Sequence, residues 1–192
     1  GCINVAESMG ALRAAEKLEP GMVAFFAIGT FAGVRPQNEL TKLDWKNINL
    51  EPGGKIKVVR STSKTSRTRY VPISENLRAW LRSIPKAKRG GPVRYSRRAF
   101  RRVVEAARVD RKGRPVEFEV ENGKPVFAKG AKAEPVRWAV DIMRHSFCTY
   151  RQALIKNINQ LCEEAGNTPA IARAHYLEPQ ESDAEVKEFW SI

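Results

Sequence analysis

One segment constrains the fold more than any other: residues 22–32, Met-Val-Ala-Phe-Phe-Ala-Ile-Gly-Thr-Phe-Ala, are almost wholly apolar. A helix that is apolar on every side has no face to offer to water, so it is buried at the centre of a domain. Gly33 directly follows the segment and is typical of a helix end. The sequence therefore predicts a central buried helix with the other elements packed around it.

The other periodic segments predict a mainly α domain with a small antiparallel three-stranded sheet, an α+β fold. Apolar residues at helical spacing predict helices over residues 8–18, 74–83, 97–109, 135–154, 159–165, 168–175 and 184–190. Alternating residues predict strands over residues 47–50, 55–60 and 68–73. Asn122-Gly123 predicts an extra β-hairpin inserted near residues 114–128, because both residues accept the positive φ of a tight turn. The length of 192 residues suits a single domain, residues 1–192, with its own core.

The charge of the chain indicates a polyanionic partner. The sequence holds 34 Lys and Arg against 21 Asp and Glu, a net charge of +13. Residues 60–114 alone contain 18 basic and three acidic residues, a net +15. A charge run is often only a solvated surface, but this much charge of one sign favours a phosphate backbone. The basic residues that we expect to contact a nucleic-acid backbone are Arg60, Arg67, Arg69, Arg97, Arg98 and Arg101.

Other classes of function are less favoured. A membrane surface is the second polyanion, but the amphipathic segments lack a basic face with bulky apolar anchors. No apolar run approaches the ~20 residues needed to span a bilayer. The three cysteines, Cys2, Cys148 and Cys162, lack metal-binding spacing. We expect Cys148 and Cys162 to be reduced core residues, which suits a cytoplasmic protein. We expect no metal and no cofactor.

Two basic residues allow both a structural and a functional interpretation. Arg35 lies at a helix junction directly after the buried segment, where a charge needs a partner. Glu39 offers an internal ion pair, which is the simpler interpretation, and a bound phosphate is the alternative. Lys64 lies on the polar tip between two predicted strands, where it is either merely solvated or in contact with phosphate.

Further side chains with suitable chemistry lie in residues 141–176. Arg144 and His145 fall on a predicted helix, and Tyr176 follows 32 residues after Arg144. A guanidinium can hold two non-bridging phosphate oxygens, and a phenol can attack phosphorus. Taken alone, residues of these types fit a structural role better than a catalytic one.

Taken together and in chain order, these pieces closely resemble the catalytic domain of the tyrosine recombinase, or phage integrase, family. The resemblance covers nearly the whole chain, from about residue 8 to 192. The stretches that carry it are Phe31-Ala-Gly-Val-Arg-Pro with Glu39 and Trp45, Ser63-Lys64-Thr65 with Arg69-Tyr-Val-Pro, Met143-Arg144-His145-Ser-Phe147, and Ala165-Gly166 with His175-Tyr176. The separation of nine residues between Asn167 and Tyr176 also fits the family.

The resemblance implies a site-specific DNA recombinase, an enzyme that cuts and rejoins DNA and serves the integration of mobile elements. Tyr176 would attack a DNA phosphate and form a 3′-phosphotyrosyl intermediate. Arg35 and Arg144 would stabilise the charge on the phosphorus, and Lys64 would protonate the departing 5′ oxygen. The resemblance implies no metal in this reaction.

The chain departs from the family pattern at two catalytic positions. The family usually has a histidine as general acid and base where this chain has Asp141, and a negative charge beside a phosphate is unfavourable unless an arginine offsets it. The family usually has His or Trp where this chain has Asn167, which can donate a hydrogen bond but brings no charge. Glu39, a supporting residue, comes four positions after Arg35 rather than three. His145 is common in the family and would have a structural role.

These departures leave an alternative open, an integrase-derived DNA-binding protein with impaired catalysis. A basic structural or RNA-binding domain is a third interpretation. Family members carry an N-terminal DNA-clamp domain, which we expect to be absent here. The apolar side of residues 182–192 predicts a C-terminal docking helix, which packs either onto its own body or onto a neighbouring copy on DNA.

Overall fold

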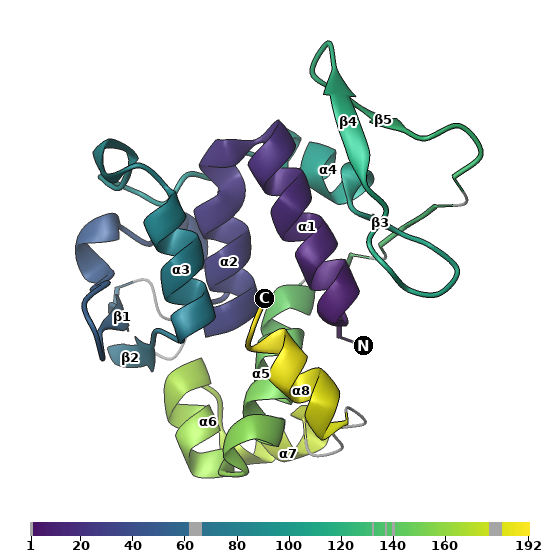
Figure 1. Cartoon of the computed structure of the whole chain (residues 1–192). Coiled ribbons are helices and arrows are strands. Elements are labelled where there is room, and N and C mark those ends of the chain that lie inside the picture. Colours follow the sequence, from purple (N-terminus) through teal and green to yellow (C-terminus); the bar gives the residue numbers. More distant parts are fainter. Residues whose placement is uncertain (1, 62–66, 132, 137, 140, 177–181) are drawn as a thin grey trace.

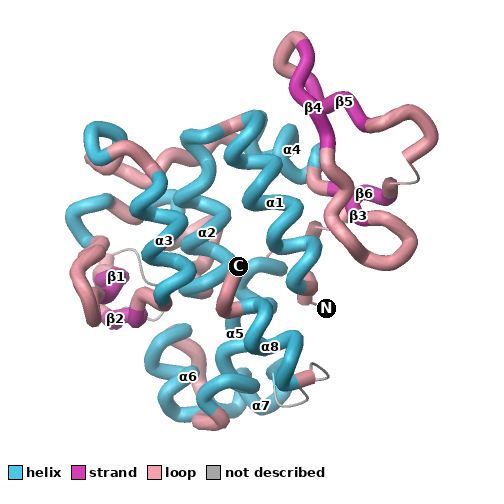
Figure 2. The backbone as a smooth tube through the Cα atoms, in the orientation of Figure 1, coloured by secondary structure: helices cyan, strands magenta, loops and turns pink. Residues whose placement is uncertain are grey.

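The computed structural model describes residues 2–61, 67–131, 133–136, 138–139, 141–176 and 182–192, without the side chains of residues 175 and 176. Helices make up most of the described structure (Figures 1 and 2). The α-helices are α1 (Val5–Leu18), α2 (Val23–Ala32), α3 (Glu75–Ser83), α4 (Arg97–Ala106), α5 (Ile142–Ile155), α6 (Ile158–Ala165), α7 (Pro169–Tyr176) and α8 (Asp183–Phe189). Four short 3-10 helices are also described: η1 (Pro20–Met22), η2 (Leu40–Lys42), η3 (Trp45–Asn47) and η4 (Lys86–Lys88).

Helix α2 lies at the centre, as its composition predicts. Every residue of the helix is buried, and α1, α3 and α5 pack around it. The helix ends at Gly33, which adopts the left-handed conformation with φ of 58°. A Cβ atom at Gly33 would collide with the ring of Phe147 on α5. Glycine is therefore required here both by the backbone and by the close approach of α5.

The strands form small antiparallel sheets at the periphery of the body, as Figure 2 shows. The pairs are β1 (Lys55–Val58) with β2 (Arg69–Pro72), β3 (Arg108–Val109) with β6 (Glu134–Pro135), and β4 (Phe118–Glu121) with β5 (Lys124–Phe127). Asn122 and Gly123 join β4 to β5 with φ of 49° and 72°, so the predicted hairpin insertion is confirmed. Figure 1 shows this hairpin projecting away from the helices.

The predicted three-stranded sheet is corrected to two strands. Residues 45–47 form the 3-10 helix η3, which is capped by a hydrogen bond from the backbone N–H of Lys46 to Asp44. The first predicted strand is reduced to one bridge, between Ile48 and Ile56 of β1. The cap stabilises a helical turn that takes in Asn47, the first residue of the predicted strand.

Helix α5 begins at Ile142, not at residue 135 as the periodicity predicts. Pro135 belongs to β6, where it lies opposite Arg108 of β3. Residues 134 and 135 are therefore extended, and their pairing with a distant strand overrides the local pattern. Asp141 immediately precedes the helix in the left-handed conformation, with φ of 64°. Aspartate is one of the few residue types that tolerate this backbone conformation.

The C-terminal helix α8 packs onto its own chain, as the first of the two predicted alternatives describes. Val186 and Phe189 are buried, and the ring of Phe189 stacks on Tyr150 of α5 with centroids 3.9 Å apart. The hydroxyl of Tyr150 donates a 2.8 Å hydrogen bond to Glu185, and Nε1 of Trp190 donates to the carbonyl of Tyr150. The apolar side of α8 is thus occupied within this chain.

Candidate active site

Arg35 and Glu39 form the ion pair that the sequence predicts as the simpler interpretation. Nη1 of Arg35 lies 2.9 Å from Oε1 of Glu39, and the backbone N–H of Arg35 donates to Oε2 at 3.0 Å. Nη2 of Arg35 donates to the carbonyl of Gly166 at 2.7 Å. The junction after α2 therefore holds Arg35 against the turn between α6 and α7, which lies 131 residues further along the chain.

Arg69 joins the same group from strand β2. Its Nη1 and Nη2 donate to both oxygens of Glu39 at 2.9 and 2.6 Å, and its Nε donates to the carbonyl of Glu164 at 2.9 Å. The residue is 7% exposed. This differs from the sequence prediction of a DNA contact, because protein acceptors enclose the guanidinium. The alternation of apolar and polar residues along β2 could have indicated this burial, because Arg69 lies on the same side of the strand as the buried Val71.

Glu39 is the acidic centre of this arrangement. The residue is 1% exposed and receives hydrogen bonds from two arginines. Burial alone would raise the pKa of Glu39, but the hydrogen bonds and charges of Arg69 and Arg35 outweigh it and hold that pKa below its ordinary value. The carboxylate is therefore ionised under physiological conditions and fixes both guanidiniums.

Arg144 joins the group from α5. It is 4% exposed, and its guanidinium donates to the carbonyls of Gly33 and Ala165, each at 2.6 Å. Burial lowers the pKa of Arg144, and the neighbouring charges of Arg35 and Arg69 act in the same direction. Arginine stays protonated even so, because its ordinary pKa lies far above neutral pH. Two guanidiniums thus bind the Glu39 carboxylate and the third lies near them, so the group carries an excess of positive charge.

Asn167 links the two arginines. Its Oδ1 accepts a hydrogen bond from Nη2 of Arg144 at 2.7 Å and from Nη2 of Arg35 at 3.2 Å. Its Nδ2 is buried and has no hydrogen-bond partner among the described residues. Gly166, with φ of 67°, makes the turn that places Asn167 here, and a Cβ at Gly166 would press on Arg69 at 3.2 Å. The site therefore presents one unsatisfied donor next to two cations.

The structure brings some of the predicted site residues together and leaves others untested. Arg35, Glu39, Arg144 and Asn167 share one hydrogen-bonded group. Tyr176 is the last residue of α7, the helix that follows Asn167, and its side chain lies outside the description. Lys64 lies outside the described residues.

The remaining predicted positions lie around this group. Asp141 precedes α5 by one residue, and its carbonyl accepts a 2.9 Å hydrogen bond from the backbone N–H of His145. Five of the predicted DNA contacts are exposed, three of them on α4: Arg60, Arg67, Arg97, Arg98 and Arg101. Backbone carbonyls of residues 33, 165 and 166 also hold the arginines, and sequence patterns give no signal for such contacts.

Two properties of the described residues bear on other site types. No three His, Cys, Asp or Glu side chains among them are grouped so as to hold a metal ion. None of the helices in that part of the chain is both long enough and apolar enough to span a membrane.

No protein-family model matches the chain, and no curated protein sequence matches it. Solved structures do resemble it. The XerA recombinase has a TM-score of 0.59 at 18% identity, over 96% of this chain and 60% of that one. The XerH site-specific recombinase, in a post-cleavage complex with its difH substrate, has a TM-score of 0.54 at 17% identity, over 100% of this chain and 53% of that one.

An integrase of a transposon shows the same likeness. The Tn1549 integrase, in complex with a circular intermediate DNA, has a TM-score of 0.53 at 19% identity, over 93% of this chain and 61% of that one. This chain thus spans between 53% and 61% of the length of these three structures. At such identities the comparisons establish the fold alone, which this chain shares with the XerA and XerH recombinases and the Tn1549 integrase. The mainly helical fold that the periodic segments predict is confirmed.

Proposed function

We propose that this chain is the catalytic domain of a site-specific DNA recombinase or integrase, which cuts and rejoins double-stranded DNA through a 3′-phosphotyrosyl intermediate. The observation that carries the proposal is the convergence of Arg35 and Arg144 on the single oxygen Oδ1 of Asn167. The shared fold with XerA, XerH and the Tn1549 integrase supports it.

The arrangement of the two arginines suits a phosphate. Both guanidiniums direct an Nη2 group to one neutral oxygen, and a guanidinium has five N–H donors in all. A non-bridging phosphate oxygen carries negative charge and accepts stronger hydrogen bonds from arginine than an amide oxygen does. A phosphate would therefore replace Oδ1 between the arginines, and Nδ2 of Asn167 would supply a further donor.

The proposed reaction uses the tyrosine at the end of α7. The phenolic oxygen of Tyr176 forms a bond to phosphorus while the bond from phosphorus to the 5′ oxygen breaks. Arg35 and Arg144 offset the charge that develops on the non-bridging oxygens. In this proposal Asp141 accepts the proton of the phenol and Lys64 gives one to the 5′ oxygen. The intermediate keeps the energy of the phosphodiester, so the reverse attack rejoins the strand.

The proposed DNA contacts lie outside this centre. Helix α4 exposes Arg97, Arg98 and Arg101, and the chain carries a net charge of +13. Such a surface binds phosphates without reading sequence and makes binding steeply dependent on salt. Self-association on DNA through residues 182–192 also belongs to the proposal. It requires that α8 leave the surface where Phe189 stacks on Tyr150.

A second candidate is an integrase-derived DNA-binding protein with impaired catalysis. The same hydrogen bonds favour it, because Asn167 occupies donors of both arginines where the family usually has His or Trp. A labelled suicide duplex, nicked so that the 5′ fragment diffuses away after cleavage, separates the two. An active recombinase becomes linked to DNA in a denaturing gel. The second candidate binds the duplex with a steep salt dependence and forms no linked species.

A further inference from the structure

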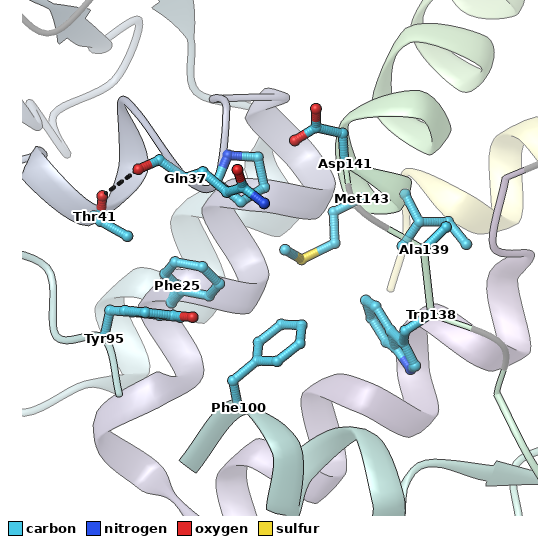
Figure 3. Close-up of a pocket in the computed structure, with 11 residues that line it drawn as sticks. Phe25, Gln37, Thr41, Tyr95, Phe100, Trp138, Ala139, Asp141 and Met143 are labelled. Atoms are coloured by element: carbon cyan, nitrogen blue, oxygen red, sulfur yellow. Dashed lines mark hydrogen bonds between the residues drawn. The ribbon is translucent and has the colours of Figure 1, made fainter. Parts of the chain in front are cut away.

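A pocket of about 370 Å³ lies between residues 36–41 and residues 138–143 (Figure 3). Four aromatic side chains line it: Phe25, Tyr95, Phe100 and Trp138. Figure 3 shows Phe25 and Tyr95 together on one side, Trp138 on the other and Phe100 between them. Pockets of this size and composition are typical of sites that bind a small apolar or aromatic group.

One wall of the pocket faces solvent. Tyr95 is 42% exposed, although its ring is tilted against Phe25 at a centroid distance of 4.8 Å. Phe100 and Trp138 meet edge to face at 6.1 Å and are only partly buried. The aromatic faces are therefore within reach of a flat group that enters from outside.

The pocket lies between the two segments that carry the catalytic arginines. Gln37, which lines it, follows Arg35 by two residues. Asp141, which also lines it, precedes Arg144 by three residues. A nucleotide whose phosphate is bound by the arginines would thus have its base close to the pocket entrance.

The polar groups at the entrance define the chemistry of the occupant. Figure 3 shows the side chains of Gln37 and Asp141 on the same side of the aromatic group. The Asp141 carboxylate accepts hydrogen bonds, and the Gln37 amide both donates and accepts them. A flat ring with an exocyclic amine satisfies this combination, since it stacks on the aromatic walls and donates to the carboxylate. An aliphatic side chain would leave these polar groups unsatisfied.

We propose that this pocket binds an unstacked nucleobase, one that carries an exocyclic amine and belongs to a nucleotide next to the phosphate held by Arg35 and Arg144. Enzymes that work on DNA take bases out of the stack into aromatic pockets, and an unpaired base costs least to extract. Base stacking on aromatic side chains tolerates any sequence. The inference rests on the DNA binding proposed above and assigns Tyr95 and Phe100 as its stacking residues.

The test compares three duplexes of one sequence: fully paired, with a single bulged 2-aminopurine, and with a bulged abasic nucleotide. The abasic bulge reproduces the flexibility of the bulge without the base. We expect the 2-aminopurine bulge to bind about tenfold tighter than the abasic bulge in fluorescence anisotropy, with quenching of 2-aminopurine emission. Tyr95→Ala should reduce this ratio to below about twofold. Tyr70→Ala removes a tyrosine that is also exposed, at 54%, and should keep the ratio.

The outcomes separate the pocket from the proposed function. Equal affinity for the two bulges in the wild type, with the paired duplex still bound, would overturn the pocket assignment alone. A ratio that persists in both Tyr95→Ala and Phe100→Ala, each with a wild-type circular dichroism spectrum, would do the same. Failure to bind any of the three duplexes at low salt would overturn the proposed DNA binding and the pocket assignment with it.

Discussion

Oδ1 of Asn167 lies 2.7 Å from Nη2 of Arg144 and accepts its hydrogen bond. The same oxygen accepts from Arg35 at 3.2 Å, so a neutral amide sits between two cations. Two guanidiniums repel each other, and an amide dipole offsets this repulsion only in part. The site is therefore arranged for an acceptor that carries more negative charge than an amide, which is what a phosphate provides.

Replacing Asn167 by aspartate tests this competition. In Asn167→Asp the carboxylate forms charge-assisted hydrogen bonds to both arginines. We therefore expect the free energy of unfolding to rise by about 1–2 kcal/mol. The same charge competes with phosphate, and DNA affinity should fall at least tenfold. Urea unfolding and fluorescence anisotropy measure the two effects. Asn157→Asp is the matched control, because it adds the same charge at the exposed N-cap of α6, where aspartate is also favoured. Equal DNA affinity of the two variants would contradict the assignment.

The buried carboxylate of Glu39 should contribute strongly to stability. Glu39→Gln leaves Arg35 and Arg69 without their shared counter-charge, and breaking a buried ion pair from one side costs roughly 3–5 kcal/mol. Urea unfolding measures this loss. Glu117→Gln offers a control, since Glu117 also pairs with two basic residues but is largely exposed, and its loss should cost less than about 1 kcal/mol. Similar losses in the two variants would show that Glu39 does not hold the site together.

Glu39 also gives the stability a dependence on acid. Its folded pKa lies below the ordinary 4.5, so near and below that pH the unfolded chain binds more protons than the folded one. The stabilisation is present in full above about pH 4.5 and is lost as the pH falls through the folded pKa. Urea unfolding between pH 6 and the acid limit should show a smaller loss in Glu39→Gln than in the wild type. The same loss in both proteins would assign the acid sensitivity to other carboxylates.

Asp141 occupies the position where the family usually has its general base. Asp141→His should raise the rate of adduct formation at least tenfold, because a histidine titrates nearer neutral pH than a carboxylate and is the more effective base there, and positioned bases contribute about 10²–10⁴. The backbone tolerates the exchange, since Asp, His and Asn are all enriched at the left-handed φ of 64°. Asp141→Asn removes the charge without adding a base and should stay slower than Asp141→His. An unchanged or lower rate in Asp141→His would show that a histidine is no better a base here than the aspartate, or that the position is not catalytic.

The parts of the fold that sequence patterns predicted depend on local chemistry. The apolar run of α2, the Asn122-Gly123 hairpin and the pair of Arg35 with Glu39 each involve residues that are close together in the sequence. The parts that they missed depend on distant partners. The pairing of β3 with β6 takes residues 134 and 135 into a strand, so the predicted helix starts later than expected. Arg69 binds Glu39, which is 30 residues away in the sequence.

The candidate site shows the same division. The sequence could name Arg144 and Asn167, but their hydrogen bond spans 23 residues and depends on the turn at Gly166. The burial of Arg69 could be predicted from the apolar Val71 two residues later, because side chains two apart on a strand share a face. The backbone carbonyls that hold the arginines carry no sequence signal, since every residue has one.

The central claim is that Tyr176 attacks a phosphate held by Arg35 and Arg144. The most direct measurement uses a pool of end-labelled, nicked duplexes with randomised sequence, incubated with the protein and resolved on a denaturing gel. Because the pool is randomised, it contains many candidate targets at once, and sequencing of the linked DNA identifies the site. Tyr70→Phe, which removes an exposed phenol elsewhere, serves as the matched control.

The predicted result is a protein–DNA species that resists denaturation, forms in the wild type and in Tyr70→Phe, and is lost in Tyr176→Phe. Arg35→Lys should slow its formation at least a hundredfold, because lysine cannot supply the bidentate donors. A linked species that persists in Tyr176→Phe would contradict the assignment of the nucleophile. Duplex binding without any linked species, even in Asp141→His, would contradict the catalytic claim itself.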